Sequence, residues 1–328
     1  MISNTKDCSV SPIENINTTT RTTSTTTSDM KNFIGDEHND SAWSKPQAER
    51  YSIRGKTYIK DKIKQPSTES AFQLFAVDLI NVDTPMYSGM CKHPNERIQI
   101  ALQREREEGN NEDDTTTTDD VLKNNDELPL PEFVFAINLC IPKAADNNDN
   151  SSGGLFYHAV FYFGVDKEQM NDIQQCTTPF GRVMNKYIFG NTDNDINEYR
   201  NKTLKLIPHV VEGNYIIKHA VGTTPTILGK EMTQYYVQDE RYLEVIIDIS
   251  SNTIANSITK LCLRYITNLT INLMFVVEGQ DESTLPERIL GGVQIKHLDF
   301  ITEIGGDGKR TVTLNESTST STSASAGL

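Results

Sequence analysis

The sequence predicts an α+β fold: a mostly antiparallel curved sheet with a long helix packed on one face. Several short segments alternate apolar and polar residues with the period of a strand. Most of them follow one another as hairpins, and a single long segment, residues 252–268, repeats its apolar residues at helical spacing. A sheet curved around a helix can also enclose an apolar cavity, as in lipid-carrying folds, so a cavity of that kind is part of the expectation.

The strands are predicted from alternation. Residues 133–141 place Phe133, Phe135, Ile137, Leu139 and Ile141 on one face. The same pattern recurs further along the chain, and two short apolar runs flank a loop before Gly222 and Pro225, which indicates two more strands. The additional predicted strands cover residues 157–163, 204–207, 215–221, 241–249, 270–277 and 293–300.

Three helices are predicted. In residues 252–268 the apolar residues form one broad stripe that includes Leu261, which we expect to be buried, and Ser251 or Asn252 can cap the first turn. Residues 94–108 begin with Pro and are followed by Gly, which is typical of a helix, and their low apolar content indicates a surface position. A shorter helix is expected over residues 180–188. The order strand, helix, strand over residues 241–277 is also compatible with a βαβ crossover.

The domain organisation follows from composition. Residues 43–303 are expected to form one domain. Residues 1–42 and 304–328 are rich in Ser, Thr and other polar residues, and we expect disordered tails there because they offer little apolar surface to bury. Residues 110–128 form an acidic loop insert and residues 144–153 a polar loop.

The net charge and the cysteine pattern limit the possible classes of protein. The formal net charge is −14, which argues against nucleic acid as a partner. The sequence has no run of about 18 apolar residues and no apolar N-terminal signal, and Ile2 stands where myristoylation needs Gly. The five Cys form no Cys-x-x-Cys pair, which fits reduced thiols. We expect a cytoplasmic protein, free or peripheral at membranes.

A basic segment is the main candidate binding site. If it forms one strand, all its cations can line one face and attract anionic lipid headgroups, at about 1 kcal/mol per basic residue. The alternative is a charged edge strand that resists aggregation. The candidate headgroup-binding residues are Arg54, Lys56, Lys60, Lys62 and Lys64. A second basic set, whose convergence depends on the fold, consists of Arg200, Lys202, Lys205, Lys218 and Lys230.

No catalytic residue, metal site or cofactor is predicted. Residues 222–231 look like a phosphate-binding loop but have Thr224 and Glu231 where that loop needs Gly and Ser or Thr. Glu244 and Asp248 share a strand face roughly 13 Å apart, too far for an acid/base pair, and are expected to face solvent or form ion pairs. For a metal, only His209, His219 and Glu212 could be brought together.

Several ordered segments resemble one family, the C-terminal domain of the plant protein Enhanced Disease Resistance two. The resemblance extends from about Trp43 to Phe300, and the ordered series makes it specific. The chain departs from the family's pattern at Leu204, Tyr215, Ile246 and Arg264. The segments that carry the resemblance are residues 51–64, 133–142, 159–163, 199–208, 221–230, 242–249, 251–255 and 285–291.

The resemblance implies a domain whose biochemical activity is unknown. Plant members of the family carry lipid-related domains upstream of it, which favours a role at membranes. We therefore expect a non-enzymatic lipid-binding or membrane-associating regulatory module whose partners are anionic membrane lipids. The alternative is a protein-interaction scaffold that binds no small ligand.

Overall fold

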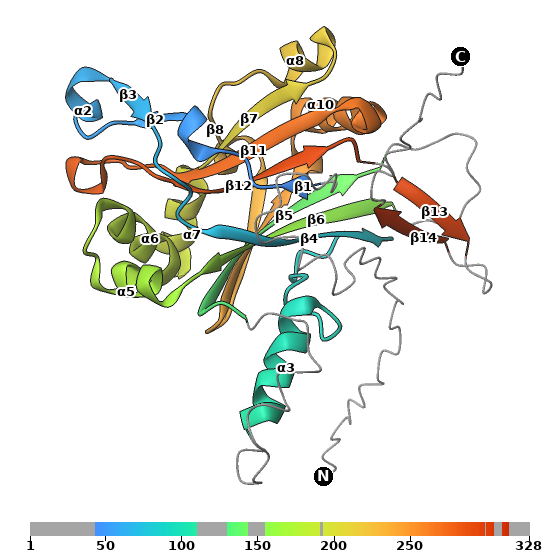
Figure 1. The fold of residues 1–328 in the computed structure, drawn as a ribbon, viewed down its shortest axis with the longest axis horizontal. Coiled ribbons are helices and arrows are strands. Elements are labelled where there is room, and N and C mark those ends of the chain that lie inside the picture. Colours follow the sequence, from blue (N-terminus) through green and yellow to red (C-terminus); the bar gives the residue numbers. More distant parts are fainter. Residues whose placement is uncertain are drawn as a thin grey trace, which may run out of the picture.

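Two five-stranded β-sheets packed face to face form the centre of the computed structural model (Figure 1). The structure describes residues 43–109, 130–143, 155–190, 193–298, 300–304 and 310–314. The expected N-terminal tail and the two expected loops, residues 1–42, 110–128 and 144–153, lie outside the described residues. So does the expected C-terminal tail, except Ile304 and Arg310–Leu314, which belong to a two-stranded pairing.

The strands of the two sheets pair as antiparallel neighbours, with one exception. In the second sheet β5 and β10 run parallel. The first sheet has the order β1 (Trp43–Ser44), β12 (Ile289–Lys296), β11 (Thr270–Val277), β7 (Leu204–Glu212) and β8 (Thr226–Ile227). The second has the order β4 (Gln73–Val82), β6 (Phe156–Val165), β5 (Phe133–Pro142), β10 (Tyr242–Asp248) and β9 (Thr233–Gln238). Two small pairings join β2 (Ser52–Arg54) to β3 (Lys64–Pro66) and β13 (Phe300–Ile304) to β14 (Arg310–Leu314).

Helices lie around the sheets and confirm the α+β class. The α-helices are α2 (Tyr58–Asp61), α3 (Arg97–Gly109), α5 (Lys167–Gln175), α6 (Pro179–Phe189), α7 (Asp193–Thr203), α8 (Tyr215–Val221), α9 (Leu228–Glu231) and α10 (Thr253–Arg264). Short 3-10 helices are η1 (Ala48–Arg50), η2 (Ile249–Ser251), η3 (Ile266–Asn268) and η4 (Glu282–Thr284). The expected helices over 94–108 and 180–188 correspond to α3 and α6.

Aromatic side chains fill the space between the sheets. The rings of Phe161 and Phe163 lie 6.4 and 6.1 Å from that of Phe275, centroid to centroid, and all three side chains are fully buried. The sheets also approach closely at Gly291, where a Cβ atom would lie 2.5 Å from the ring of Phe163. The expected lipid-carrier-like cavity is therefore not confirmed, because its place between the layers is a packed core.

The second sheet is buried on both faces. The face predicted from residues 133–141 lies in the core between the sheets, as expected. On the other face Val134 and Ala136 pack under the segment that contains Met90, Cys91 and α3. A strand covered on both sides has little reason to alternate apolar and polar residues, and β5 accordingly reads as an almost continuous apolar run.

Helix α10 forms where predicted but packs differently. The Asn252 carboxamide oxygen accepts hydrogen bonds from the amides of Ile254 and Ala255, as expected for its N-cap. No residue of α10 is buried, and Leu261 is only half-buried, so its predicted burial is wrong. The βαβ expectation is wrong too, since β10 and β11 belong to different sheets. A long helix on a sheet face is not confirmed.

Residues 215–221, predicted as a strand, form helix α8. The Asn214 side chain caps the amide of Ile217, and the amide of Gly222 bonds back to the carbonyl of Lys218. Gly222 has a positive φ of 64°, which favours glycine at the end of a helix. Ile217 is fully buried and anchors α8 to the end of the first sheet. The two capping signals therefore outweigh the β propensity of this short apolar run.

Candidate functional site

The basic segment forms a projecting hairpin rather than one strand (Figure 1). Strands β2 and β3 pair antiparallel, and α2 forms a single turn between them. The turn closes where Lys62 adopts a left-handed backbone conformation and the Asp61 carboxylate accepts the amide proton of Ile63. The expectation that all five cations line one strand face is therefore wrong. Residues 56–64, here called the basic tip, are displayed together by the turn.

Four lysines on the basic tip are exposed. Lys60 pairs with Glu282 at 2.9 Å, and the Lys62 ammonium donates to the carbonyl of Ile59. In the described part of the chain, Lys56 and Lys64 have neither an ion-pair nor a hydrogen-bond partner for their ammonium groups. The tip contains one carboxylate, that of Asp61, so positive charge predominates there in a chain that is acidic as a whole.

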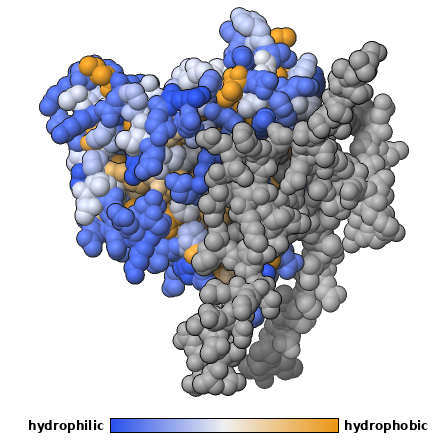
Figure 2. All heavy atoms as spheres, viewed as in Figure 1, coloured by the Kyte–Doolittle hydropathy of each residue, from blue (hydrophilic) through white to orange (hydrophobic). Residues whose placement is uncertain are grey.

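Two isoleucines stand among these lysines. Ile59 is 38% exposed and Ile63 is 61% exposed. Figure 2 shows hydrophobic residues at the end of the projection at the upper left, surrounded by hydrophilic ones. Exposed cations next to exposed aliphatic side chains are typical of segments that lie in a membrane interface. The sequence analysis missed these isoleucines, although their positions between lysines were visible.

Arg54 lies at the root of the hairpin and faces inward. Its guanidinium is 2.8 Å from the carboxylate of Glu278 and donates to the carbonyl of Gly279. The backbone of Arg54 exchanges hydrogen bonds with Glu287, whose carboxylate also binds the ammonium of Lys205 at 2.6 Å. These ion pairs favour an anchoring role for Arg54 and leave the four lysines as the cations displayed to solvent.

A buried polar network spans three strands of the second sheet. The carboxylate of Glu244 accepts hydrogen bonds from the amides of Met90 and Cys91 and from the side chain of Asn138. The Asn138 carboxamide oxygen is in turn 2.8 Å from Nδ1 of His158. The sequence expectation for Glu244 is wrong, because the face that carries it is covered by the segment before α3 rather than exposed or ion-paired.

The protonation of this network follows from its geometry. The Met86 amide donates to Nε2 of His158, so the imidazole proton must sit on Nδ1, where it bonds to Asn138. Burial lowers the pKa of His158 to about 4, and burial raises the pKa of Glu244 above its usual value. The acceptor positions of Glu244 are occupied by fixed donors, which indicates that it holds the covering segment in place.

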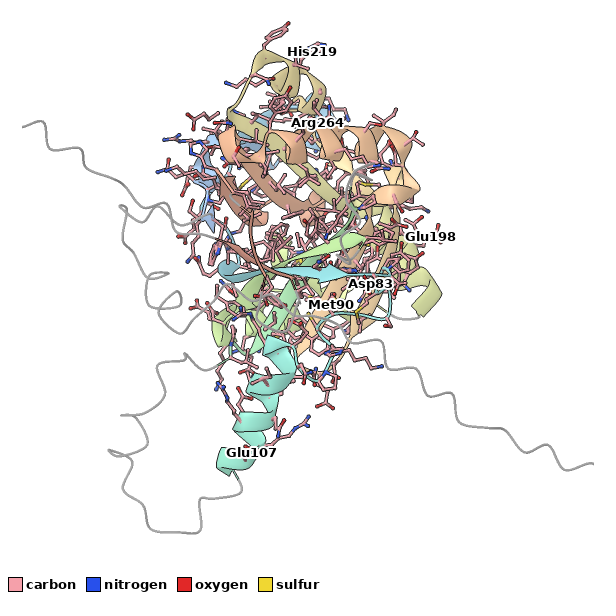
Figure 3. All side chains as sticks on the ribbon, turned by 90° about the vertical axis from the view of Figure 1, so that its right-hand side faces the viewer. Asp83, Met90, Glu107, Glu198, His219 and Arg264 are labelled. Carbon is pink, nitrogen blue, oxygen red and sulfur yellow. The ribbon has the colours of Figure 1, made fainter. Side chains whose placement is uncertain are left out.

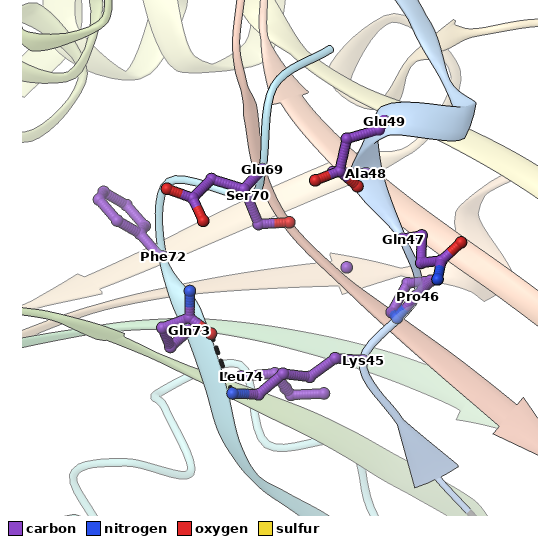
Figure 4. Close-up of a pocket in the computed structure, with 11 residues that line it drawn as sticks. Lys45, Pro46, Gln47, Ala48, Glu49, Glu69, Ser70, Phe72, Gln73 and Leu74 are labelled. Carbon is purple, nitrogen blue, oxygen red and sulfur yellow. Dashed lines mark hydrogen bonds between the residues drawn. The ribbon is translucent and has the colours of Figure 1, made fainter. Parts of the chain in front are cut away.

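One surface pocket of about 200 Å³ lies between the residues around Lys45 and the start of β4 (Figure 4). The ammonium of Lys45 donates to the carboxamide oxygen of Gln73 at 2.9 Å, and burial lowers the pKa of Lys45. Glu49, Glu69 and Phe72 complete much of the wall. The volume is below that of typical small-molecule sites, so we assign no ligand to it.

The other candidate residues do not converge. His209 contacts the hydroxyl of Tyr51, Glu212 pairs with His297, and His219 stacks on Tyr215. Among the described residues no group of three His, Cys, Asp or Glu side chains could hold a metal ion. The second basic set is divided as well: Arg200 and Lys205 are buried with partners, Lys202 pairs with Glu198, and Lys218 and Lys230 lie on separate helices.

Residues 43–299 match the family described as "Protein ENHANCED DISEASE RESISTANCE 2, C-terminal". The chain belongs to this family. It is 27% identical over 282 residues to "Protein ENHANCED DISEASE RESISTANCE 2-like" of Arabidopsis thaliana, an alignment that covers 84% of this chain and 32% of that protein. The chain thus spans about a third of the length of this relative. No solved structure matches it.

The segments that carry the family resemblance meet in space. Arg54, from the first of them, binds Glu287, from the last, and Asn138 binds Glu244 across neighbouring strands. The family match confirms the resemblance stated from the sequence, and in this chain the matching segments build the hairpin root and the buried network. In the described ranges no helix has the length and apolar content needed to cross a bilayer.

Proposed function

We propose that this chain is a non-enzymatic module that associates peripherally with anionic membranes through its basic tip. The observation that carries the proposal is the combination of four exposed lysines and two exposed isoleucines on one projecting hairpin. The lysines supply attraction to anionic headgroups, and the isoleucines supply apolar area that leaves water on binding.

The hairpin is suited to this role because ion pairs hold its root and because its four lysines outnumber the two acids near them, Asp61 within the tip and Glu282, which pairs with Lys60. Arg54 is fixed by Glu278 and Glu287, so the tip is held at a defined angle to the first sheet. Charge acts only within about 10 Å of a membrane at ordinary salt. An acidic chain can therefore bind an anionic surface if its projecting part is basic.

The test is co-sedimentation with phosphatidylcholine vesicles that contain or lack phosphatidylserine. Lys56→Gln with Lys64→Gln removes two exposed cations that have no partner in the described part of the chain. At about 1 kcal/mol each, the loss should weaken binding roughly 30-fold at low salt. Lys92→Gln with Lys167→Gln removes two other exposed cations and serves as the matched control.

A second arm tests the apolar contribution. Ile63→Ser should weaken binding to the anionic vesicles at every salt concentration, because apolar contact is not screened. Binding that is equal in the tip variant and the control variant would refute the role of the tip. An unmodified protein that binds no vesicles would refute the proposal as a whole and favour the scaffold alternative.

A further inference from the structure

A second apolar and basic surface lies on α8 and α10. Tyr215 and Ile216, at the start of α8, are 79% and 67% exposed. Their neighbour Ile217 is buried, so the helix is anchored on one side and displays these two side chains on the other. Lys218 and His219 follow on the same short helix, both exposed. Figure 2 shows hydrophobic residues on this projection at the top of the molecule.

Helix α10 packs beside α8 and extends the surface. Leu261 and Cys262 of α10 contact the cluster that contains Ile217, and Figure 3 shows Arg264 just below His219. Residues 213–230 and 249–277 contain no Asp or Glu, although the chain carries a net charge of −14. The cations of α8 and α10 are Lys218, Lys260 and Arg264, while Lys230, also in the first segment, lies on α9. The acids that directly flank the two segments are Glu212, Glu231, Asp248 and Glu278. Glu212 pairs with His297, Asp248 accepts a hydrogen bond from Tyr87, and Glu278 pairs with Arg54.

This surface lies at the opposite end of the first sheet from the basic tip. Strand β7 begins beside the hairpin root, where Lys205 binds Glu287, and ends at Glu212, just before α8. Nine residues at about 3.4 Å each separate the two ends by roughly 30 Å. In Figure 1 both α2 and α8 lie along the upper side of the molecule. Both projections can therefore meet one broad surface.

We infer that α8 and α10 form a second contact with the same anionic bilayer, an inference that rests on the proposed function. Tyr215 is an aromatic side chain with a polar end, the type enriched at membrane interfaces, and it stands beside an aliphatic residue and cations. A stable protein interface needs a contiguous patch of about 800 Å² per partner. The apolar side chains here sit on two separated projections instead, and a bilayer is broad enough to contact both at once.

Tryptophan substitutions at exposed positions test the inference with one set of vesicles. Ile216→Trp, Ile63→Trp and, as a control, Phe189→Trp each add one reporter to the full chain, whose single native tryptophan gives a common background. Phe189 is 45% exposed at the end of α6, which lies away from α8 in Figure 1. The probe is a phosphatidylcholine and phosphatidylserine vesicle whose lipids carry brominated chains, which quench a tryptophan that enters the interface.

The expected result is added quenching at positions 63 and 216 and none at 189. Quenching at 63 without quenching at 216 overturns the inference and leaves the proposed function standing. Quenching at 216 alone supports the α8–α10 contact and overturns the role of the basic tip. Quenching at neither position overturns both. An unchanged thermal midpoint checks that each variant is folded.

The vesicle affinity of a second variant tests the α8–α10 contact independently. Tyr215→Ser with Ile216→Ser should weaken binding to the same vesicles about tenfold, because two linked contacts bind more tightly than one. Phe189→Ser removes an exposed aromatic ring elsewhere and should leave the affinity unchanged. Equal affinities for the double variant and this control overturn the inference, whatever the basic tip contributes.

Discussion

The side-chain amide of Asn138 donates a 2.7 Å hydrogen bond to the carboxylate of Glu244, and neither residue reaches solvent. The pair joins the parallel strands β5 and β10 and continues to His158 on β6. Polar groups buried at this depth are stable only when their partners are in place. The stability of the second sheet should therefore depend on this network and on the protonation of its members.

The first prediction concerns pH and His158. Its folded-state pKa, about 4, lies below the ordinary value near 6.5, so the unfolded chain binds more protons between those values. Acidification from pH 6.5 to 4 should thus reduce the free energy of unfolding by up to about 3 kcal/mol through this residue. Chemical denaturation across this range, compared with His158→Gln, measures the contribution.

The glutamine variant should be less stable at pH 7 but have a flatter profile below pH 6.5. Glu244 acts in the opposite sense: its raised pKa favours the folded state at low pH, and that contribution is lost as the pH rises. Because Glu244 is present in both proteins, the difference between them reports His158. Parallel pH profiles would contradict the assignment of the buried neutral imidazole.

The second prediction concerns the ion pairs at the hairpin root. Lys205→Met leaves the carboxylate of Glu287, 2% exposed, without its closest cation and should cost about 3 to 5 kcal/mol of unfolding free energy. Lys202→Met breaks the exposed pair with Glu198 and should change stability by less than about 1 kcal/mol. Urea denaturation compares the two. Similar losses would mean that the root is not a buried cluster.

The third prediction contrasts two leucines. Leu269→Ala should cost about 2 to 5 kcal/mol, because Leu269 is fully buried and its removal leaves a cavity. Leu261→Ala, on the half-buried face of α10, should cost distinctly less, about 1 kcal/mol. The thermal midpoints of the two variants compare these losses of stability. An equal or larger loss at Leu261 would show that α10 is packed more tightly than its exposure indicates.

The fourth prediction concerns Gly229 in α9. A Cβ atom at this position would lie 2.5 Å from the backbone of Asn201, so Gly229→Ala should shift α9 against α7 and cost about 1 to 3 kcal/mol. Gly222→Ala meets no atom within 4 Å and should cost only the strain of its positive φ, about 1 kcal/mol. Thermal denaturation ranks the two. Equal stability of Gly229→Ala and the unmodified protein would contradict the close helix packing.

The strands that sequence reasoning located best are long, mostly apolar segments with one face in the core between the sheets. Residues 133–141 and 270–277 form β5 and β11 as predicted, because one face of each enters the core between the sheets. Glu244 was misjudged because β10 is buried on both faces. The Glu244 side chain points away from the core between the sheets, and the alternation pattern alone predicts that such a side chain faces solvent. Only the position of the segment before α3, set by tertiary packing, covers it.

The candidate site was predictable in composition but not in shape. The lysines of residues 56–64 are visible in the sequence, yet their display depends on a turn that one carboxylate and one left-handed residue close. Helix α8 had local signals in the sequence, a capping Asn214 before it and Gly222 after it. The apolar residues between them were instead interpreted as a strand. Which helices lie beside α8, and where the hairpin projects, follow from contacts between residues far apart in the chain.

The close approach at Gly291 has a mechanical consequence. Any side chain there would act as a wedge against the ring of Phe163 and force the two sheets apart at that point. Because protein interiors are close-packed, such a separation would also loosen the contacts of the neighbouring core side chains Phe161 and Phe275. The absence of a side chain at this one glycine therefore permits the close spacing of the two layers at this point.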